Sequence, residues 1–197
     1  MKISRRACLK AMSAMSAAAL APAVGFFAGI PAAHAAVPGE RILVVYYSRQ
    51  GHTAKAAQAV AAATGGRLLE IETDPPYPKD YSGTVAAKKK DDEAKRLPKL
   101  AASAMPGDLS AYDVVFIGSP IWSGDLALAV KSWLGEAKLA KKKIALFVTH
   151  MGSGVSDSQK SLEALAPGND FAAPLSLYST PDDLEAQVRA WTAKVLG

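Results

Sequence analysis

The chain has 197 residues, of which 50% are hydrophobic and 21% are charged. This length comfortably allows one domain, and the composition supports a packed core and excludes a largely disordered chain. The chain holds 23 basic and 18 acidic residues, but four of the basic residues and no acid lie in residues 1–35, which leaves 19 basic against 18 acidic in the remainder. That near balance gives no nucleic-acid-binding signature. The scattered charges after residue 40 exclude a polytopic membrane protein.

Residues 1–35 have the organisation of a targeting signal. A basic segment is followed by an uncharged, alanine-rich stretch and by the small-residue pattern Ala-His-Ala, which is typical of a cleaved signal peptide. Residues 4–10 (SRRACLK) resemble the twin-arginine pattern Ser-Arg-Arg-x-Phe-Leu-Lys, with Cys8 in place of the phenylalanine. This resemblance predicts export of the folded protein to the periplasm, with residues 36–197 as its domain.

The alternative for the N-terminal segment is an uncleaved membrane anchor, because the uncharged run of residues 11–39 is long enough to span a bilayer. Cys8 is the single cysteine of the chain. The domain that follows therefore cannot contain an intramolecular disulfide, a thiolate nucleophile or a cysteine-ligated metal site.

Beyond this segment, short apolar runs rich in β-branched residues alternate with helical patterns. Residues 41–47 (RILVVYY) predict a buried strand and residues 67–73 (RLLEIET) a second strand, and the alanine-rich residues 53–64 predict a helix between them. After a proline-rich segment, residues 81–97 predict a charged helix that Pro98 ends.

The second half of the chain repeats this rhythm. Strands are predicted for residues 114–117, 143–149 and 171–178, and helices for residues 126–134, 159–165 and 182–196. At the start of the last helix, Thr180 is the expected N-cap and Pro181 the first helical residue, and the two aspartates that follow favour the positive end of the helix dipole.

Five strands that alternate with helices predict an α/β fold in which a parallel sheet is covered on both faces. In open sheets of this kind, ligands bind beyond the carboxyl ends of the strands, at the switch point of the topology. We therefore expect the functional residues in the loops that follow the first, third and fourth strands.

The first of these loops, residues 48–53 (SRQGHT), is suited to a phosphate. The hydroxyls of Ser48 and Thr53, the backbone N–H groups and the positive end of the helix dipole converge at such a turn, which Gly51 permits. The loop is neither a Walker loop nor a dinucleotide fingerprint, because it lacks both glycine patterns. The alternative is an ordinary connection with a threonine cap.

The other two loops offer an aromatic ring and close backbone approach. Residues 118–124 (GSPIWSG) place Trp122 after the third strand, where its ring is suited to stack on a planar ligand or, alternatively, to cover the edge of the sheet. Residues 149–154 (THMGSG) follow the fourth strand, and their glycines either let backbone amides approach a ligand or simply form a turn.

Together, residues 47–53, 118–124 and 149–154 resemble the three FMN-contacting loops of flavodoxins. The similarity is closer to the flavodoxin-like branch that has Pro-Tyr-Pro-x-x-Tyr before a charged helix, as in residues 76–81 (PYPKDY), and it covers residues 40–197. It implies a flavodoxin-like three-layer sandwich with a five-stranded sheet of order 2-1-3-4-5, and FMN as the cofactor. His52 stands where the family often has asparagine. By position, the resemblance implies sixteen cofactor-binding residues: Ser48, Arg49, Gln50, Gly51, His52, Thr53, Ser119, Pro120, Ile121, Trp122, Ser123, Gly124, Thr149, Met151, Gly152 and Ser153.

A bound FMN would carry the reactive atoms itself, so the resemblance implies no catalytic side chain and no metal. Two roles follow: an electron carrier between redox partner proteins, or a reductase of a quinone or similar small acceptor with NAD(P)H as donor. Carriers of this kind tend to be monomers, and reductases often assemble as oligomers such as homodimers. Membrane contact is expected only through an uncleaved signal.

Two further readings come from other classes of protein. A cofactor-free binding module is compatible with the same fold. A hydrolase would use Ser123 or Ser153 with His52 or His150, but the sequence has no Gly-x-Ser-x-Gly at a strand-to-helix turn and no acid marked as the orienting partner.

The basic residues Lys88, Lys89, Lys90, Lys95 and Arg96 alternate with acids in the charged helix. We interpret them as a solvated helix face, with the steering of an acidic partner or a nicotinamide phosphate as the alternative. Tyr77 and Tyr81 of the proline-rich segment have no assigned role.

Overall fold

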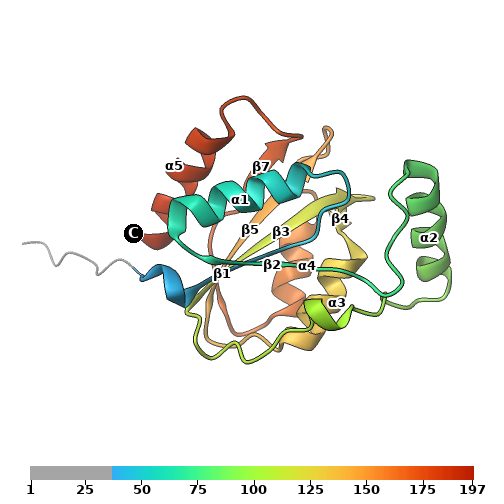
Figure 1. Cartoon of the computed structure of the whole chain (residues 1–197), viewed down its shortest axis with the longest axis horizontal. Coiled ribbons are helices and arrows are strands. Elements are labelled where there is room, and N and C mark those ends of the chain that lie inside the picture. Colours follow the sequence, from blue (N-terminus) through green and yellow to red (C-terminus); the bar gives the residue numbers. More distant parts are fainter. Residues whose placement is uncertain (1–36) are drawn as a thin grey trace, which may run out of the picture. The chain divides into compact units, whose positions relative to one another are not determined.

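The computed structural model describes residues 37–197, and it contains the alternation of strands and helices that the sequence predicts (Figure 1). The predicted signal peptide and its alternative, the uncleaved anchor, lie outside the described residues. The strands are β1 (Ile42–Tyr46), β2 (Arg67–Glu70), β3 (Val114–Trp122), β4 (Asp125–Leu126), β5 (Lys143–His150), β6 (Asp170–Phe171) and β7 (Leu175–Tyr178). The helices are α1 (His52–Thr64), α2 (Tyr81–Glu93), α3 (Leu128–Ala137), α4 (Ser158–Leu165) and α5 (Leu184–Leu196), with short 3-10 turns at Gly39–Arg41 and Ala102–Ala104.

The sheet has the order β2-β1-β3-β5, continued by β6 and β7, which both pair with β5. Every pair along this path is parallel. In terms of the five predicted strands the order is 2-1-3-4-5, as expected, so the predicted α/β fold class is confirmed. The switch point lies between β1 and β3, where the topology reverses direction.

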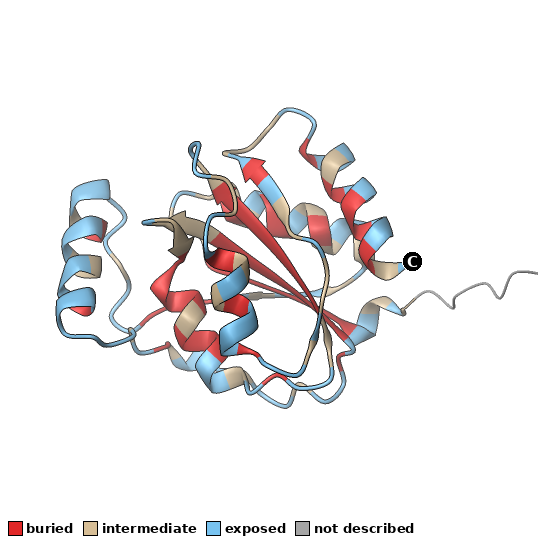
Figure 2. Ribbon diagram, turned by 180° about the vertical axis from the view of Figure 1, so that it is seen from behind, coloured by how far each residue is buried: buried red, intermediate tan, exposed pale blue. Residues whose placement is uncertain are grey.

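Side chains of the central strands alternate between two apolar cores, one on each face of the sheet. In β1, Ile42 and Val44 pack with α1 and α5, whereas Leu43 and Val45 point to the other core, which contains α3. Helices α1 and α5 thus cover one face, and α3 and α4 cover the other (Figure 1). Because both faces are covered, the central strands β1, β3 and β5 are buried along most of their length, as Figure 2 shows, and this explains their continuous apolar runs.

The third strand is longer than predicted, and it ends in a hairpin. We expected a strand over residues 114–117 and a loop after it, but β3 runs to Trp122 and pairs antiparallel with β4. Ser123 and Gly124 form the turn between them, with φ angles of 52° and 80°. Two central residues with positive φ are typical of the tight turn that best matches the twist of a two-stranded hairpin.

The fifth predicted strand is divided into β6 and β7, and together with the hairpin strand β4 this gives the sheet seven strands instead of five. Ile144 pairs with Phe171, and Phe147 pairs with Leu175. Between these two pairs β5 advances by three residues, whereas the chain that forms β6 and β7 advances by four. Pro174 lies within this stretch and lacks the N–H group that a continuous ladder needs. The extra residue forms a bulge that separates β6 from β7.

Several predicted helix ends differ from the observed ones, among them both ends of α3, which was predicted for residues 126–134 and spans Leu128–Ala137. Helix α2 ends at Glu93 instead of residue 97, because Lys95 adopts a positive φ of 48°. The Arg96 and Lys95 N–H groups then donate to the carbonyls of Asp91 and Asp92, which is a Schellman motif.

Helix α5 begins at Leu184 instead of residue 182, and Asp183 takes the N-cap position that we predicted for Thr180. The side chain of Thr180 is engaged elsewhere, since its hydroxyl lies 2.8 Å from Nδ1 of His52. None of the helices described here is both long enough and apolar enough to cross a membrane.

Candidate functional site

A cavity of about 600 Å³ lies at the carboxyl ends of β1, β3 and β5, on the side of the switch point. All three predicted loops contribute to it. It is lined by Ser48, Arg49, Gln50, His52, Thr53, Tyr81, Thr84, Val85, Lys88, Pro120, Ile121, Trp122, Ser123, Thr149, His150, Met151, Ser153 and Ser179. None of these lining residues is an aspartate or glutamate, so the charged side chains that face the cavity, Arg49 and Lys88, are cationic.

The first loop presents polar groups and backbone amides at the start of α1. Gly51 has a φ of 92°, a conformation that side-chain-bearing residues rarely adopt, and it places His52 at the first helical position. The Ser48 hydroxyl accepts a hydrogen bond from the Gly51 N–H at 3.1 Å, which holds the turn closed. The first N–H groups of a helix have no partner within the helix, so they are free to receive an anion.

Polar contacts of Thr53 and His52 join this loop to neighbouring segments. The hydroxyls of Thr53 and Thr149 lie 2.7 Å apart in a buried position and connect the first loop to β5. His52 connects the loop to the segment before α5, because its Nδ1 lies 2.8 Å from the Thr180 hydroxyl and 3.2 Å from that of Ser179.

The second loop is the β3–β4 hairpin, which carries Trp122 into the cavity wall. The Trp122 ring packs edge-to-face against Tyr47 and Tyr77, with centroid separations of 5.5 and 5.2 Å. This aromatic cluster attaches the hairpin to β1 and to the proline-rich segment. The Trp122 ring is therefore fixed in orientation on one side.

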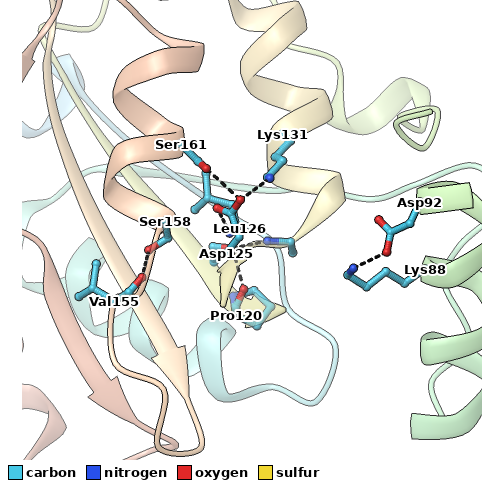
Figure 3. A network of polar contacts seen from close by, with 11 residues as sticks. Lys88, Asp92, Pro120, Asp125, Leu126, Lys131, Val155, Ser158 and Ser161 are labelled. Atoms are coloured by element: carbon cyan, nitrogen blue, oxygen red, sulfur yellow. Dashed lines mark hydrogen bonds and ion pairs between the residues drawn. The ribbon is translucent and has the colours of Figure 1, made fainter. Parts of the chain in front are cut away.

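On its other side, the hairpin is held by Asp125 (Figure 3). Its Oδ2 accepts hydrogen bonds from Lys131 Nζ of α3 at 2.5 Å and from the Ser161 hydroxyl of α4 at 2.9 Å. Its Oδ1 accepts from the N–H of Leu126 at 2.6 Å. Burial alone would raise the pKa of Asp125, but these hydrogen bonds outweigh it and hold the pKa below its usual range. The charged carboxylate thus connects the hairpin to both helices of this face.

In the third loop, residues 149–154, His150 is the last residue of β5, and its ring is fixed by two polar contacts. Its Nδ1 accepts a hydrogen bond from the Gly152 N–H at 3.0 Å, and its Nε2 lies 2.9 Å from the Ser176 hydroxyl. Met151 is 74% exposed on the rim of the cavity, beside Ser153. This loop therefore forms the open side of the site.

The structure brings twelve of the sixteen predicted site residues to the cavity wall. The other four, Gly51, Ser119, Gly124 and Gly152, do not line it. Ser119 lies behind the wall, fully buried, where its hydroxyl accepts a hydrogen bond from the Ala127 N–H at 3.0 Å and donates to the Pro120 carbonyl at 2.9 Å. Its contacts position the hairpin and the start of α3.

Sequence reasoning missed one wall of the cavity, which helix α2 provides through Tyr81, Thr84, Val85 and Lys88. It also missed Ser179 and left His150 out of the cofactor-binding set, although both line the cavity. The Pro-Tyr-Pro-x-x-Tyr motif was the available signal for α2, because it precedes this helix. A local pattern does not reveal which way a surface helix turns its residues.

A contact between Tyr77 and Asp91 attaches helix α2 to the segment that precedes it. The Tyr77 hydroxyl donates to Asp91 Oδ2 at 2.6 Å, and the Arg96 side chain donates to the other oxygen at 2.8 Å. Burial, together with the neighbouring carboxylate, raises the pKa of Tyr77. Burial opposes ionisation of Asp91, but the two hydrogen bonds hold its pKa below the usual range. At neutral pH, Tyr77 is therefore a neutral phenol and Asp91 a charged carboxylate.

The hydrolase alternative finds no support in the described residues 37–197. Neither Ser123 nor Ser153 donates to a histidine, and no carboxylate contacts His52 or His150. A serine nucleophile needs an adjacent base that a third group orients. Within this same part of the chain, no group of three or more His, Cys, Asp or Glu side chains is arranged to hold a metal ion.

The chemistry of the donors matches a mononucleotide that carries a flat ring. Hydroxyls, helix amides and Arg49 gather at the first loop, as a phosphate requires. Trp122, Ile121 and Pro120 provide an apolar wall beside it. A doubly wound sheet with such a cavity at its switch point defines the class of mononucleotide-binding α/β proteins.

The sequence profile of the Flavodoxin family matches residues 41–194, and this chain belongs to that family. Among solved structures, a protein from Bacteroides eggerthii DSM 20697 assigned to the flavoproteins is 29% identical, with a TM-score of 0.66 over 79% of this chain and 97% of its own. A flavoprotein from Lactobacillus acidophilus NCFM in complex with FMN is 23% identical, with a TM-score of 0.60 over 78% of this chain and 99% of its own, and this likeness shows the shared fold.

Curated relatives match a shorter region. An NAD(P)H dehydrogenase (quinone) of Gluconacetobacter diazotrophicus is 33% identical over 96 residues, which cover 47% of this chain and 44% of that protein. A protein of the same name from Azorhizobium caulinodans is 30% identical over 99 residues, 49% of this chain and 46% of its own length. The chain therefore matches less than half the length of these relatives.

Proposed function

We propose that this chain is an FMN-binding redox protein that reduces a small acceptor such as a quinone. The observation that carries the proposal is the convergence of three separate loops on one cavity that has no acidic lining residue, in a chain of the Flavodoxin family. The FMN complex of the Lactobacillus acidophilus flavoprotein supports the choice of cofactor. The names of the curated relatives support NAD(P)H as electron donor and a quinone as acceptor.

The residues of the first loop would hold the phosphate, and the β3–β4 hairpin and the third loop would flank the ring. When bound, FMN supplies the electron-transfer chemistry, and the protein supplies binding, orientation and local charge. Thr53 and Ser48 present hydroxyls beside the amides at the start of α1. Trp122 is held by its aromatic neighbours and presents an apolar wall that excludes water from one side of the cavity.

The first test is the flavin content of the purified protein and its preference for phosphate. We expect stoichiometric FMN, identified by chromatography after denaturation, and tighter binding of FMN than of riboflavin, which lacks the phosphate. Thr53→Val removes a hydroxyl from the phosphate loop and is expected to weaken FMN binding about tenfold or more, because hydrogen bonds to charged groups are the strong ones. Riboflavin binding should change much less.

Thr64→Val is the matched control, because Thr64 lies at the other end of α1 and donates to the Val60 carbonyl. It should leave both affinities unchanged. A protein that binds neither flavin, or that binds FMN and riboflavin equally well, would contradict the proposed cofactor site. Steady oxidation of NADH or NADPH in the presence of a quinone would support the reductase; bound FMN without such turnover would favour an electron carrier between proteins.

We also propose that residues 1–35 direct export through the twin-arginine route, on the basis of the SRRACLK pattern alone. In a bacterial host that has this route, the full chain is expected in the periplasmic fraction. Replacement of both Arg5 and Arg6 by lysine should retain it in the cytoplasm. Equal periplasmic amounts of the two proteins would contradict the twin-arginine assignment, and recovery of the protein in the membrane fraction would favour the uncleaved anchor.

A further inference from the structure

Two adjacent lysines of α2 have different surroundings, although both form an ion pair with the residue four positions further along the helix. Lys88 pairs with Asp92 at 2.6 Å, and Lys89 pairs with Glu93 at 3.7 Å. The side chain of Lys88 is only 20% exposed and lines the cavity, whereas that of Lys89 is 74% exposed. The expected solvated helix face therefore holds for Lys89 and is wrong for Lys88.

The orientation of α2 follows from the residues that share a face with Lys88. Thr84, Lys88 and Asp91 recur at helical spacing, and Thr84 and Asp91 are the two buried residues of this helix. Asp91 is held by the Tyr77 hydroxyl at 2.6 Å, and Tyr77 in turn packs on Trp122. The face that carries Lys88 is thus turned toward the cavity by contacts that also hold the hairpin.

The charges around Lys88 leave its positive charge effective in the cavity. Figure 3 shows the contact between Lys88 and its partner Asp92. Asp92 is about half exposed and does not line the cavity, whereas Lys88 does, so the pair turns its positive end inward. The other titratable or charged groups that face the cavity are Arg49 from the first loop, Tyr81 from α2, His52 from α1 and His150 from β5. Arg49 is held by the Lys79 carbonyl at 3.0 Å and by the Tyr81 ring.

We propose that Lys88 sets the reduction potential of the flavin, by placing a positive charge on the α2 side of the cavity. This inference rests on the proposed function, because it requires FMN in the cavity. Each electron that enters the flavin adds one negative charge unless a proton follows it, so a nearby cation favours the reduced form. Lys88 is a tuning residue in this role and takes no part in bond making.

The test compares Lys88→Met with Lys89→Met in the FMN-loaded full chain, with the potential measured by equilibration against a dye of known potential. Lys88→Met is expected to lower the preference for reduced over oxidised FMN about tenfold, which corresponds to about 30 mV for a two-electron couple. Lys89→Met removes the same charge one position along the helix and should leave the potential close to that of the wild type.

Asp92→Asn is a second, independent variant, because it keeps Lys88 and removes its counter-charge. It is expected to shift the potential upward, opposite in sign to Lys88→Met, and both variants should retain the circular dichroism of the wild type. Tyr77→Phe loosens the contact that orients α2, so the effect of Lys88→Met should be smaller in a Tyr77→Phe background.

The outcomes separate this inference from the proposed function. A wild-type protein that binds no FMN would overturn the proposed function. FMN binding with the same potential in Lys88→Met as in the wild type would overturn the role of Lys88 alone. Equal shifts in Lys88→Met and Lys89→Met would also overturn it, because they would indicate the net charge of the protein instead of a charge in the cavity.

Discussion

Gly118→Ala is expected to destabilise the fold by about 3 kcal/mol, the upper part of the range for overpacked cores. Gly118 lies in the middle of β3, between β1 and β5, opposite Tyr46 and Phe147. A Cβ atom at this position would lie 2.3 Å from Cζ of Phe147 and 2.9 Å from Cβ of Tyr46. Both neighbours are buried, so neither can move aside without displacing the core.

The change should also weaken FMN binding, because β3 leads directly into Pro120 and Trp122 of the cavity wall. Urea unfolding followed by circular dichroism would measure the stability, and flavin titration the affinity. Gly135→Ala in α3 is the matched control: a Cβ there meets no atom within 4 Å. It should stabilise the protein by roughly 0.5–1 kcal/mol, the usual gain for alanine in a helix. An unchanged midpoint for Gly118→Ala would show that the strands separate more easily than this packing indicates.

Asp125→Asn is expected to cost about 1–3 kcal/mol of stability and to weaken FMN binding. The substitution preserves the acceptor for the Leu126 N–H but replaces Oδ2 by an NH₂ group. That group would face two donors, Lys131 Nζ and the Ser161 hydroxyl, which now lie within 2.9 Å of the carboxylate. The side chain is only 26% exposed, so water cannot readily replace the lost acceptor. The β3–β4 hairpin would lose its connection to α3 and α4.

The stability that Asp125 contributes depends on pH. Because the folded-state pKa of Asp125 is lowered, its ionisation contributes stability that is present above the unfolded-state pKa of about 4. That contribution is lost as the pH falls below about 4 and through the folded-state value. The difference in unfolding free energy between the wild type and Asp125→Asn should therefore be constant near neutral pH and should shrink in acid.

Glu93→Gln serves as the control for Asp125→Asn, because it removes an exposed carboxylate whose ion pair with Lys89 is 3.7 Å long. It should change the stability by no more than about 0.5 kcal/mol. Urea midpoints measured from pH 7 down to pH 3 would check both variants. If Asp125→Asn kept the wild-type stability and FMN affinity at pH 7, the proposed role of this carboxylate in holding the hairpin would be wrong.

The sequence alone determined the layers of this protein and the strands that carry its site. The runs RILVVYY and KKIALFVT place apolar side chains on both faces of a strand. Only a strand that is covered on both faces of the sheet needs such a run. Loops such as residues 48–53 and 149–154 were recognisable because glycine and hydroxyl residues directly follow a strand. These signals are local, since the apolar run of a strand and the residue types of a turn are read from neighbouring residues in the chain.

Only the tertiary structure decided which side chains meet in the cavity. The sequence of α2 is charged around its circumference, so nothing in it separates Lys88 from Lys89; the Tyr77–Asp91 contact, which joins residues from two segments, makes that choice. The bulge between β6 and β7 and the role of Asp125 arise in the same way. Each depends on packing or hydrogen bonds between residues distant in the chain, and such contacts leave no periodic pattern in the sequence.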